Sequence, residues 1–157
     1  MDLFSILLFV HVLGAIVAFG PGFVTPIAGS MVAKEPQHGN FLARVNVATV
    51  RGVVVPVSIV MALSGVAMIL DRGWTNITAG RHWLEVGIAL YVVAFLFAVL
   101  VQSSNGRKLA ALTATPPAPG TRPNPEVPAT AKRLRYGGYF LSLLVIVIVF
   151  LMVTKPF

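Results

Sequence analysis

The sequence predicts an all-α fold, an integral membrane four-helix bundle that forms a single transmembrane domain over residues 1–157. Hydrophobic residues make up 57% of the chain and charged residues only 11%, whereas soluble domains carry about 25% charged residues. Four apolar runs have the length of about 20 residues that a helix needs to cross a bilayer, and none alternates like a membrane β-strand. They lie at about residues 3–26, 52–70, 83–101 and 136–153.

The first run is expected to be a permanent span. The chain begins with Met1 and Asp2, without the basic residues of a signal peptide, and the apolar run is longer than the core of one. A Gly-Pro-Gly sequence at residues 20–22 and Pro26 predict a kink or a break in its second half. The apolar pattern itself continues as far as Val32.

The distribution of lysine and arginine predicts the orientation. Nine of the 12 Lys and Arg residues lie in the connections that follow the first and third runs. Cytoplasmic loops are enriched in these residues, so we expect these two connections to be cytoplasmic and both termini to be extracytoplasmic. Trp74 and Trp83 flank the short outer loop and suit an interfacial aromatic belt. The predicted location is the bacterial plasma membrane, as a multi-pass protein.

A proline-rich loop occupies about residues 113–128, between the third and fourth runs. Proline lacks the backbone N–H and has a fixed φ, so this composition disfavours helix and predicts an extended, polyproline-like strip. We expect residues 106–112 to continue the third helix and residues 129–135 to start the fourth one early. The strip is a candidate docking loop for a partner protein. Its prolines are Pro116, Pro117, Pro119, Pro123, Pro125 and Pro128.

His11 is the clearest ionisable residue inside a predicted span. At about 1.5 Å per residue, it lies roughly 12 Å into the apolar core from the outer side. Such residues are costly in lipid and mark functional sites by default. His11 is therefore a candidate haem or metal ligand, or a proton-handling residue. The alternative, which is commoner for a lone histidine, is a neutral imidazole that hydrogen-bonds a neighbouring helix.

A second polar cluster, at the outer end of the third run, contains Arg81, His82 and Glu85. His82 and Glu85 share a helix face at i, i+3 spacing, where they could shuttle protons or bind a cation. A commoner role for such residues is to start a helix, because an acidic side chain is favoured near the positive N-terminal dipole. His82 is expected at the membrane surface, too far from His11 for the two imidazoles to share one haem iron.

Small residues recur at four-residue spacing in the first run and at looser spacing, four and then three residues, in the second run, and both sets predict close helix packing. In the first run they are Gly14, Ala18 and Gly22, and in the second run they are Ser58, Ala62 and Gly65.

Several functional classes are excluded or disfavoured. The chain has no cysteine, which excludes disulfides, thiolate zinc sites, iron–sulfur clusters and c-type haem attachment. The net charge of +7 comes from cations beside the apolar runs, so topology and anionic lipid headgroups explain it better than nucleic acid does. No nucleophile–base pair, phosphate loop or carboxylate-rich metal site is present. We therefore predict no catalytic residue, no metal site and no self-sufficient enzyme.

Residues 11–20 read HVLGAIVAFG, a histidine followed by Gly-Ala and Phe-Gly pairs. In this stretch and in its topology, the chain resembles an uncharacterised family of four-helix bacterial predicted integral membrane proteins. That family is similar to membrane proteins of the copper-resistance D type and the protoporphyrinogen-oxidase type. The resemblance implies a haem or copper ligand at His11. The aromatic-Gly-Gly pattern of those groups departs here to Phe-Gly-Pro-Gly at residues 19–22.

The leading functional interpretation is a non-catalytic accessory or assembly subunit of a larger membrane complex. The Val/Ala/Pro-rich composition resembles that of actinobacterial proteins. In size and topology, the chain is similar to accessory subunits of the mycobacterial cytochrome bcc–aa3 respiratory supercomplex, including its association factor. This interpretation implies other membrane subunits and phospholipids as partners, no nucleic acid, and no cofactor of its own. The alternatives are a haem- or metal-binding membrane protein that uses His11, and a small transporter or permease.

Overall fold

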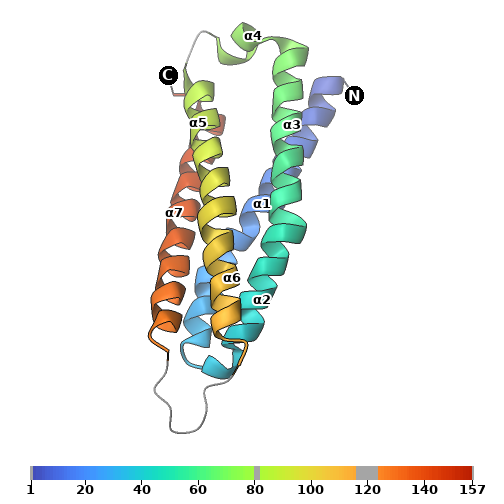
Figure 1. Ribbon diagram of the computed structural model, residues 1–157. Helices are drawn as coiled ribbons and strands as arrows, with labels where there is room; N and C mark the ends of the chain where they lie inside the picture. The colour runs from blue at the N-terminus through green and yellow to red at the C-terminus, as the bar shows by residue number, and fades with distance from the viewer. Residues whose placement is uncertain (1, 80–81, 116–123, 157) are drawn as a thin grey trace.

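The computed structural model describes residues 2–79, 82–115 and 124–156. All regular secondary structure in these residues is helical, in agreement with the predicted all-α class. Four helical segments are long and apolar enough to cross a membrane, as the sequence predicts (Figure 1). Their bounds are Leu3–Val32, Pro36–Arg72, Trp83–Leu112 and Glu126–Thr154.

The second and third segments each combine shorter elements, and each includes a π-helical turn. The elements, in chain order, are α1 (Leu3–Val32), η1 (Pro36–His38), α2 (Gly39–Thr49), the π-turn η2 (Val50–Val54), α3 (Val55–Arg72), α4 (Trp74–Thr78), α5 (Trp83–Leu96), the π-turn η3 (Phe97–Gln102), α6 (Ser103–Leu112) and α7 (Glu126–Thr154). Such turns accommodate one extra residue per turn and often occur near functional sites.

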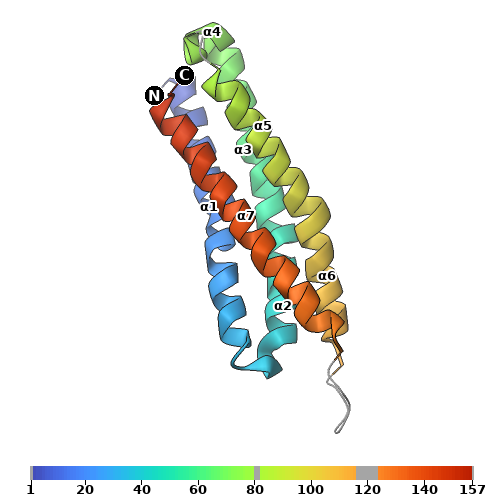
Figure 2. The same ribbon diagram turned by 90° about the vertical axis from the view of Figure 1, so that its left-hand side faces the viewer.

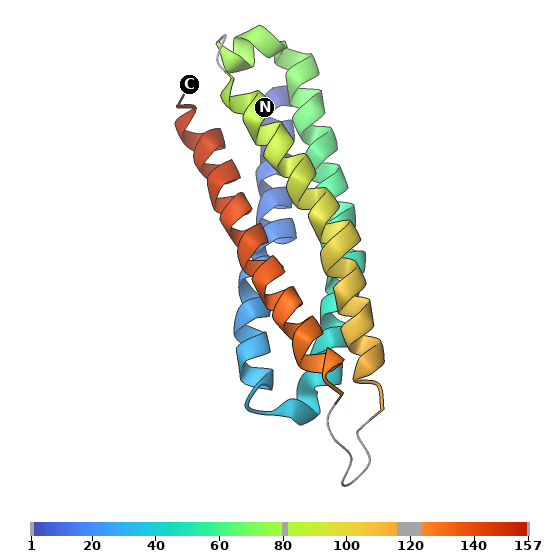
Figure 3. The same ribbon diagram turned by 60° about the vertical axis from the view of Figure 1, so that its left-hand side comes forward.

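Helix α1 packs against both α3 and α7, while α7 also packs against α5 and α6, and α2 packs against α6. Figures 1 and 2 show the start of α1, the end of α7 and helix α4 at one end of the bundle. Helix α2, η1 and the end of α6 lie at the opposite end (Figure 3). We call these the α4 end and the η1 end.

Helix α1 is continuous through both of its prolines, so the predicted break does not occur. Pro26 has no N–H to donate to the carbonyl four residues earlier, which belongs to Gly22. The hydroxyl of Ser142 on α7 donates a long hydrogen bond, 3.4 Å, to that carbonyl. One turn earlier, the Thr25 hydroxyl donates to the carbonyl of Pro21 at 2.9 Å. A neighbouring helix thus supplies a donor for the carbonyl that Pro26 leaves without its helical partner, as is common inside membranes.

The helices also extend beyond the predicted spans. Helix α7 begins at Glu126, so the proline-rich loop is shorter than the predicted residues 113–128. Pro128 lies in the first turn of α7, where backbone N–H groups have no partner within the helix and proline is tolerated. The Asn124 side chain accepts a hydrogen bond of 2.9 Å from the backbone N–H of Glu126, which helps to start the helix. The prediction that Pro128 belongs to the extended strip was therefore wrong.

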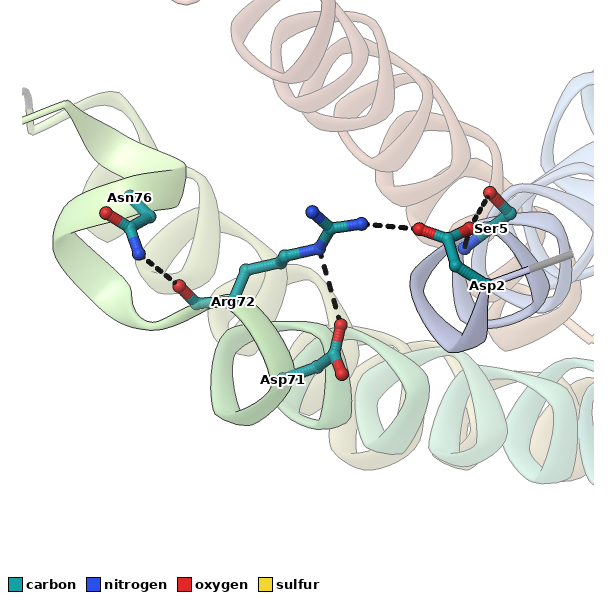
Figure 4. A network of polar contacts seen from close by, with 5 residues as sticks. All are labelled: Asp2, Ser5, Asp71, Arg72 and Asn76. Carbon is teal, nitrogen blue, oxygen red and sulfur yellow. Dashed lines mark hydrogen bonds and ion pairs between the residues drawn. The ribbon is translucent and has the colours of Figure 1, made fainter.

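A polar network at the α4 end joins the start of α1 to the end of α3 (Figure 4). Asp2 caps α1, because its carboxylate accepts hydrogen bonds from the backbone N–H and the hydroxyl of Ser5. Arg72 forms ion pairs with Asp2 and with Asp71, and its carbonyl accepts a 2.7 Å hydrogen bond from the Asn76 amide. These exposed groups hold the ends of α1, α3 and α4 together.

Candidate functional site

Two glycines allow α1 and α3 to approach each other closely around His11. A Cβ atom at Gly14 on α1 would lie 3.1 Å from the Cβ atom of Met61 on α3. A Cβ atom at Gly65 on α3 would lie 3.1 Å from Cε1 of His11 on α1. Contacts this short are tighter than ordinary van der Waals contact, so a methyl group at either position would push its neighbour on the facing helix away by a few tenths of an ångström.

This close approach places the His11 ring against the backbone of α3. The Nδ1 atom of His11 lies 2.8 Å from the main-chain oxygen of Met61 and 3.3 Å from the Oγ atom of Ser64. The Ser64 hydroxyl donates its own hydrogen to the same Met61 oxygen at 2.8 Å. Ser64 is buried, and His11 is half-buried.

The partners of Nδ1 determine the tautomer of His11. A main-chain oxygen can only accept a hydrogen bond, so Nδ1 carries the proton and donates it. The Ser64 hydroxyl is committed to Met61, so its oxygen can accept from the same Nδ1–H group. In the neutral ring Nε2 then carries the lone pair. The arrangement therefore fixes the ring plane and presents Nε2 as a hydrogen-bond acceptor or a metal ligand.

The second predicted cluster lies away from His11. His82 precedes the first turn of α5, and its Nδ1 atom lies 3.0 Å from the Oε2 atom of Glu85. Both side chains are largely exposed. Arg81, the third member of the predicted cluster, lies outside the described residues. Glu85 lies in the first turn of α5, near the positive end of the helix dipole, and the His82 side chain makes no capping hydrogen bond to the helix backbone.

The six predicted packing residues differ in their surroundings. Gly14, Ala18 and Ser58 are buried, and the Ser58 carbonyl accepts a 2.8 Å hydrogen bond from the Tyr91 hydroxyl on α5. Gly65 contacts His11, as described above, and Ala62 is half-buried. Gly22 has no atom within 4 Å of an added Cβ, and instead its carbonyl contacts Ser142.

Four of the six predicted docking prolines lie outside the described residues. They are Pro116, Pro117, Pro119 and Pro123. Pro125 directly precedes α7, and Pro128 lies within it.

Two polar residues near the helix interfaces were not singled out from the sequence. Ser64, which contacts His11, is a serine within an apolar run, and this is the signal that could have identified it. Gln102, the last residue of η3, donates a 3.0 Å hydrogen bond from Nε2 to the Leu134 carbonyl on α7. Its Oε1 atom is buried and has no hydrogen-bond partner among the described residues. The amide packs directly against Gly137.

Comparison with known proteins identifies a family but gives no functional assignment. Residues 5–156 match the family described as Predicted integral membrane protein (DUF2269). The comparison with curated proteins gives no match, and neither does the comparison with solved structures. The match covers almost the whole chain and all four long helices. The chain therefore belongs to the DUF2269 family of predicted integral membrane proteins.

Proposed function

We propose that this protein is a haem-binding protein of the bacterial plasma membrane, in which His11 would ligate the iron. The observation that carries the proposal is the hydrogen bond between His11 Nδ1 and the Met61 carbonyl, 2.8 Å long. Metal-binding histidines almost always donate the second ring N–H to a carbonyl or a carboxylate, which fixes the tautomer and orients the ligating nitrogen. His11 has this arrangement on the Nδ1 side, and Nε2 is the nitrogen left for iron.

The residues present fit haem better than they fit a bare metal ion. A protein-bound metal ion usually takes three or four side-chain ligands, and no group of three His, Asp or Glu side chains converges within the described residues. Haem iron already has four porphyrin nitrogens, so a single axial histidine is sufficient. When bound, haem would supply one-electron redox chemistry, and His11, held by Met61 and Ser64, would orient it.

Absorbance spectroscopy tests this function directly. The purified protein, expressed with haem supplementation or reconstituted with hemin, is expected to show a Soret band at a stoichiometric level. His11→Ala is expected to lose the band. His82→Ala is the matched control, because His82 is exposed and paired with Glu85 at the start of α5, and it is expected to keep the band. A wild-type protein without a Soret band, or a His11→Ala variant that retains it, would refute the proposal.

A second candidate function, an accessory subunit of a larger membrane complex, is favoured by a different observation. Gly20 and Gly52 are exposed, and nothing lies within 4 Å of a Cβ atom built at either position. Small residues on a membrane-facing surface allow a helix from another protein to approach closely. The respiratory complex is the partner that the resemblance in size and topology suggests. In this role the protein would perform no reaction alone, and it could still carry haem.

Co-purification tests this second candidate. A tagged copy, extracted in mild detergent, is expected to elute with other membrane subunits at fixed stoichiometry. Gly20→Leu is expected to weaken that association without affecting the fold, because the added side chain points into open space. A protein that elutes alone under several mild conditions and after cross-linking would count against the accessory role.

A further inference from the structure

A cavity of about 480 Å³ lies near the η1 end of the bundle, between α1, α2, α6 and α7. Its volume falls within the range of about 300–1,000 Å³ that is typical of small-molecule sites. Most of its wall is apolar: Pro26 and Gly29 come from α1, Leu42 from α2, Leu109 from α6 and Leu134 from α7. This site is separate from His11, which does not line it.

Two cations line the same cavity, Lys132 and Arg135, both from α7. Neither forms an ion pair with a carboxylate among the described residues, and residues 116–123, which the structure does not describe, contain no Asp or Glu. Glu126, at the start of the same helix, pairs with Lys108 on α6. Both cations lie within 6 Å of the Tyr136 ring. The cavity therefore combines an apolar wall with positive charge that no carboxylate neutralises.

The cations lie at the level expected for lipid headgroups. The 20 residues from Arg135 to Thr154, at the end of α7, extend about 30 Å at about 1.5 Å per residue, which is the thickness of the hydrocarbon core. Lys132 lies almost one turn beyond Arg135. Tyr136 and Tyr139 follow directly on the core side, and tyrosine is enriched at membrane interfaces. Pro26, which lines the cavity, lies beside Gly138 on the core side of Arg135, so the cavity reaches the edge of the hydrocarbon level while its cations lie at the phosphate level.

We propose that this cavity binds one anionic phospholipid from the leaflet at the η1 end. The phosphate is held by Lys132 and Arg135, and an acyl chain occupies the apolar part beside Gly29. Charge complementarity selects an anionic lipid, and the apolar wall selects a lipid over a free phosphate ion, which would leave that wall unfilled. Basic pockets between membrane helices are a recurrent mode of anionic lipid recognition. This proposal does not depend on haem binding at His11.

The first test asks whether the positive charge of the cavity selects an anionic lipid. It measures binding of dioleoylphosphatidylglycerol and dioleoylphosphatidylcholine to the delipidated protein in detergent by native mass spectrometry. One phosphatidylglycerol is expected to bind in preference to phosphatidylcholine. The preference is expected to fall by about fivefold for each cation removed in Lys132→Gln and Arg135→Gln. Arg133→Gln is the matched control, because Arg133 is an exposed arginine of the same helix that does not line the cavity. An equal loss in Arg133→Gln would overturn the proposal in favour of general surface attraction.

The second test asks whether the lipid occupies the cavity, and it uses two leucine variants of α1. Gly29 lines the cavity and has open space where a side chain would point, so Gly29→Leu is expected to fill the cavity and reduce retention of phosphatidylglycerol by at least tenfold. Gly20→Leu, on the same helix and equally open but outside the cavity, is expected to retain the lipid. Unchanged binding in Gly29→Leu, with both variants monodisperse, would overturn the proposal. So would efficient competition by inorganic phosphate, or disulfide-linked dimers formed by Gly29→Cys, which would identify a second copy as the occupant.

Discussion

The Nδ1 atom of His11 lies 2.8 Å from the main-chain oxygen of Met61, so a polar side chain of α1 is hydrogen-bonded to the backbone of α3 within the apolar part of the bundle. Gly65 makes this contact sterically possible, because the ring of His11 occupies the space that a Cβ atom there would need. The position of the His11 ring therefore depends on both the Met61 carbonyl and the absence of a side chain at Gly65.

Gly65→Ala is expected to destabilise the protein by about 1–3 kcal/mol, the usual range for overpacking. The new methyl group would lie 3.1 Å from Cε1 and 3.3 Å from Nδ1 of His11, so the ring would have to shift by a few tenths of an ångström, which strains its hydrogen bond with Met61. Thermal unfolding in detergent measures the loss. Gly20→Ala is the control, and it is expected to be neutral or slightly stabilising, because its site is open and alanine favours helix.

Adding His11→Ala to Gly65→Ala is expected to recover part of that loss, since the smaller side chain leaves room for the methyl group. If the two destabilisations simply add in the double variant, the ring and the glycine do not interact, and the contact described here is wrong.

The adjacent glycines of α7 are expected to respond differently to the same substitution. A Cβ atom at Gly137 would lie 2.6 Å from Oε1 of Gln102, whereas one at Gly138 would lie 3.5 Å from Pro26, an ordinary contact distance. Gly137→Ala displaces the Gln102 amide, the end of a flexible side chain, from its hydrogen bond with the Leu134 carbonyl, so it should destabilise by about 1 kcal/mol, more than Gly138→Ala does. Chemical or thermal unfolding compares the pair.

The contact with Gln102 is the reason why alanine is expected to be less favourable at Gly137 than at Gly138, so removal of the Gln102 side chain tests this explanation. The double variant Gln102→Ala with Gly137→Ala is expected to be more stable than the sum of the single changes predicts, because no amide then opposes the methyl group. Equal effects at the two glycines would contradict the packing of Gln102 against Gly137.

The Asp2 cap predicts a stability change at acidic pH. Hydrogen bonds from the Ser5 hydroxyl and backbone N–H, with a smaller contribution from Arg72, lower the pKa of Asp2 below its ordinary value of 3.8. Since the folded-state pKa is below that of the unfolded chain, the carboxylate stabilises the fold above about pH 3.8. This contribution is lost as the pH falls through the lower, folded-state pKa. Asp2→Asn is expected to remove this part of the pH dependence of thermal unfolding.

NMR titration of the Asp2 carboxyl group tests whether Ser5 causes the lowered pKa of Asp2. Ser5→Ala is expected to raise the pKa of Asp2 towards 3.8, since it removes the largest cause of the shift. Ser30→Ala, at the other end of α1, is the control and should leave the titration unchanged. An unchanged Asp2 titration in Ser5→Ala would mean that the cap is not formed.

The orientation predicted from lysine and arginine can be measured by cysteine labelling, because the natural chain contains no cysteine. Thr75→Cys lies on α4 and Thr115→Cys follows α6, and both positions are exposed. A membrane-impermeant maleimide is expected to label Thr75→Cys in intact cells and Thr115→Cys only after permeabilisation. The reverse pattern would place both termini in the cytoplasm.

The sequence could identify His11 as a candidate but not its environment. Its position inside an apolar run is local information, whereas its partners Met61 and Ser64 lie on another helix, 50 and 53 residues away in the sequence. Gln102 was missed for the same reason, since its contact with Gly137 depends on how α7 is rotated. The end of the proline-rich loop was misplaced because Pro128 is acceptable in the first turn of a helix.

The sequence by itself determined that the chain forms four long apolar helices, because hydropathy is a local property and the thickness of a bilayer fixes the length of a span. Only the tertiary structure decided which faces of those helices meet. A helix that is apolar on all sides carries no stripe to identify its packing face. Which ring nitrogen of His11 is engaged, and where Lys132 meets an apolar cavity, therefore depend on the rotation and close approach of helices, which glycines such as Gly65 permit.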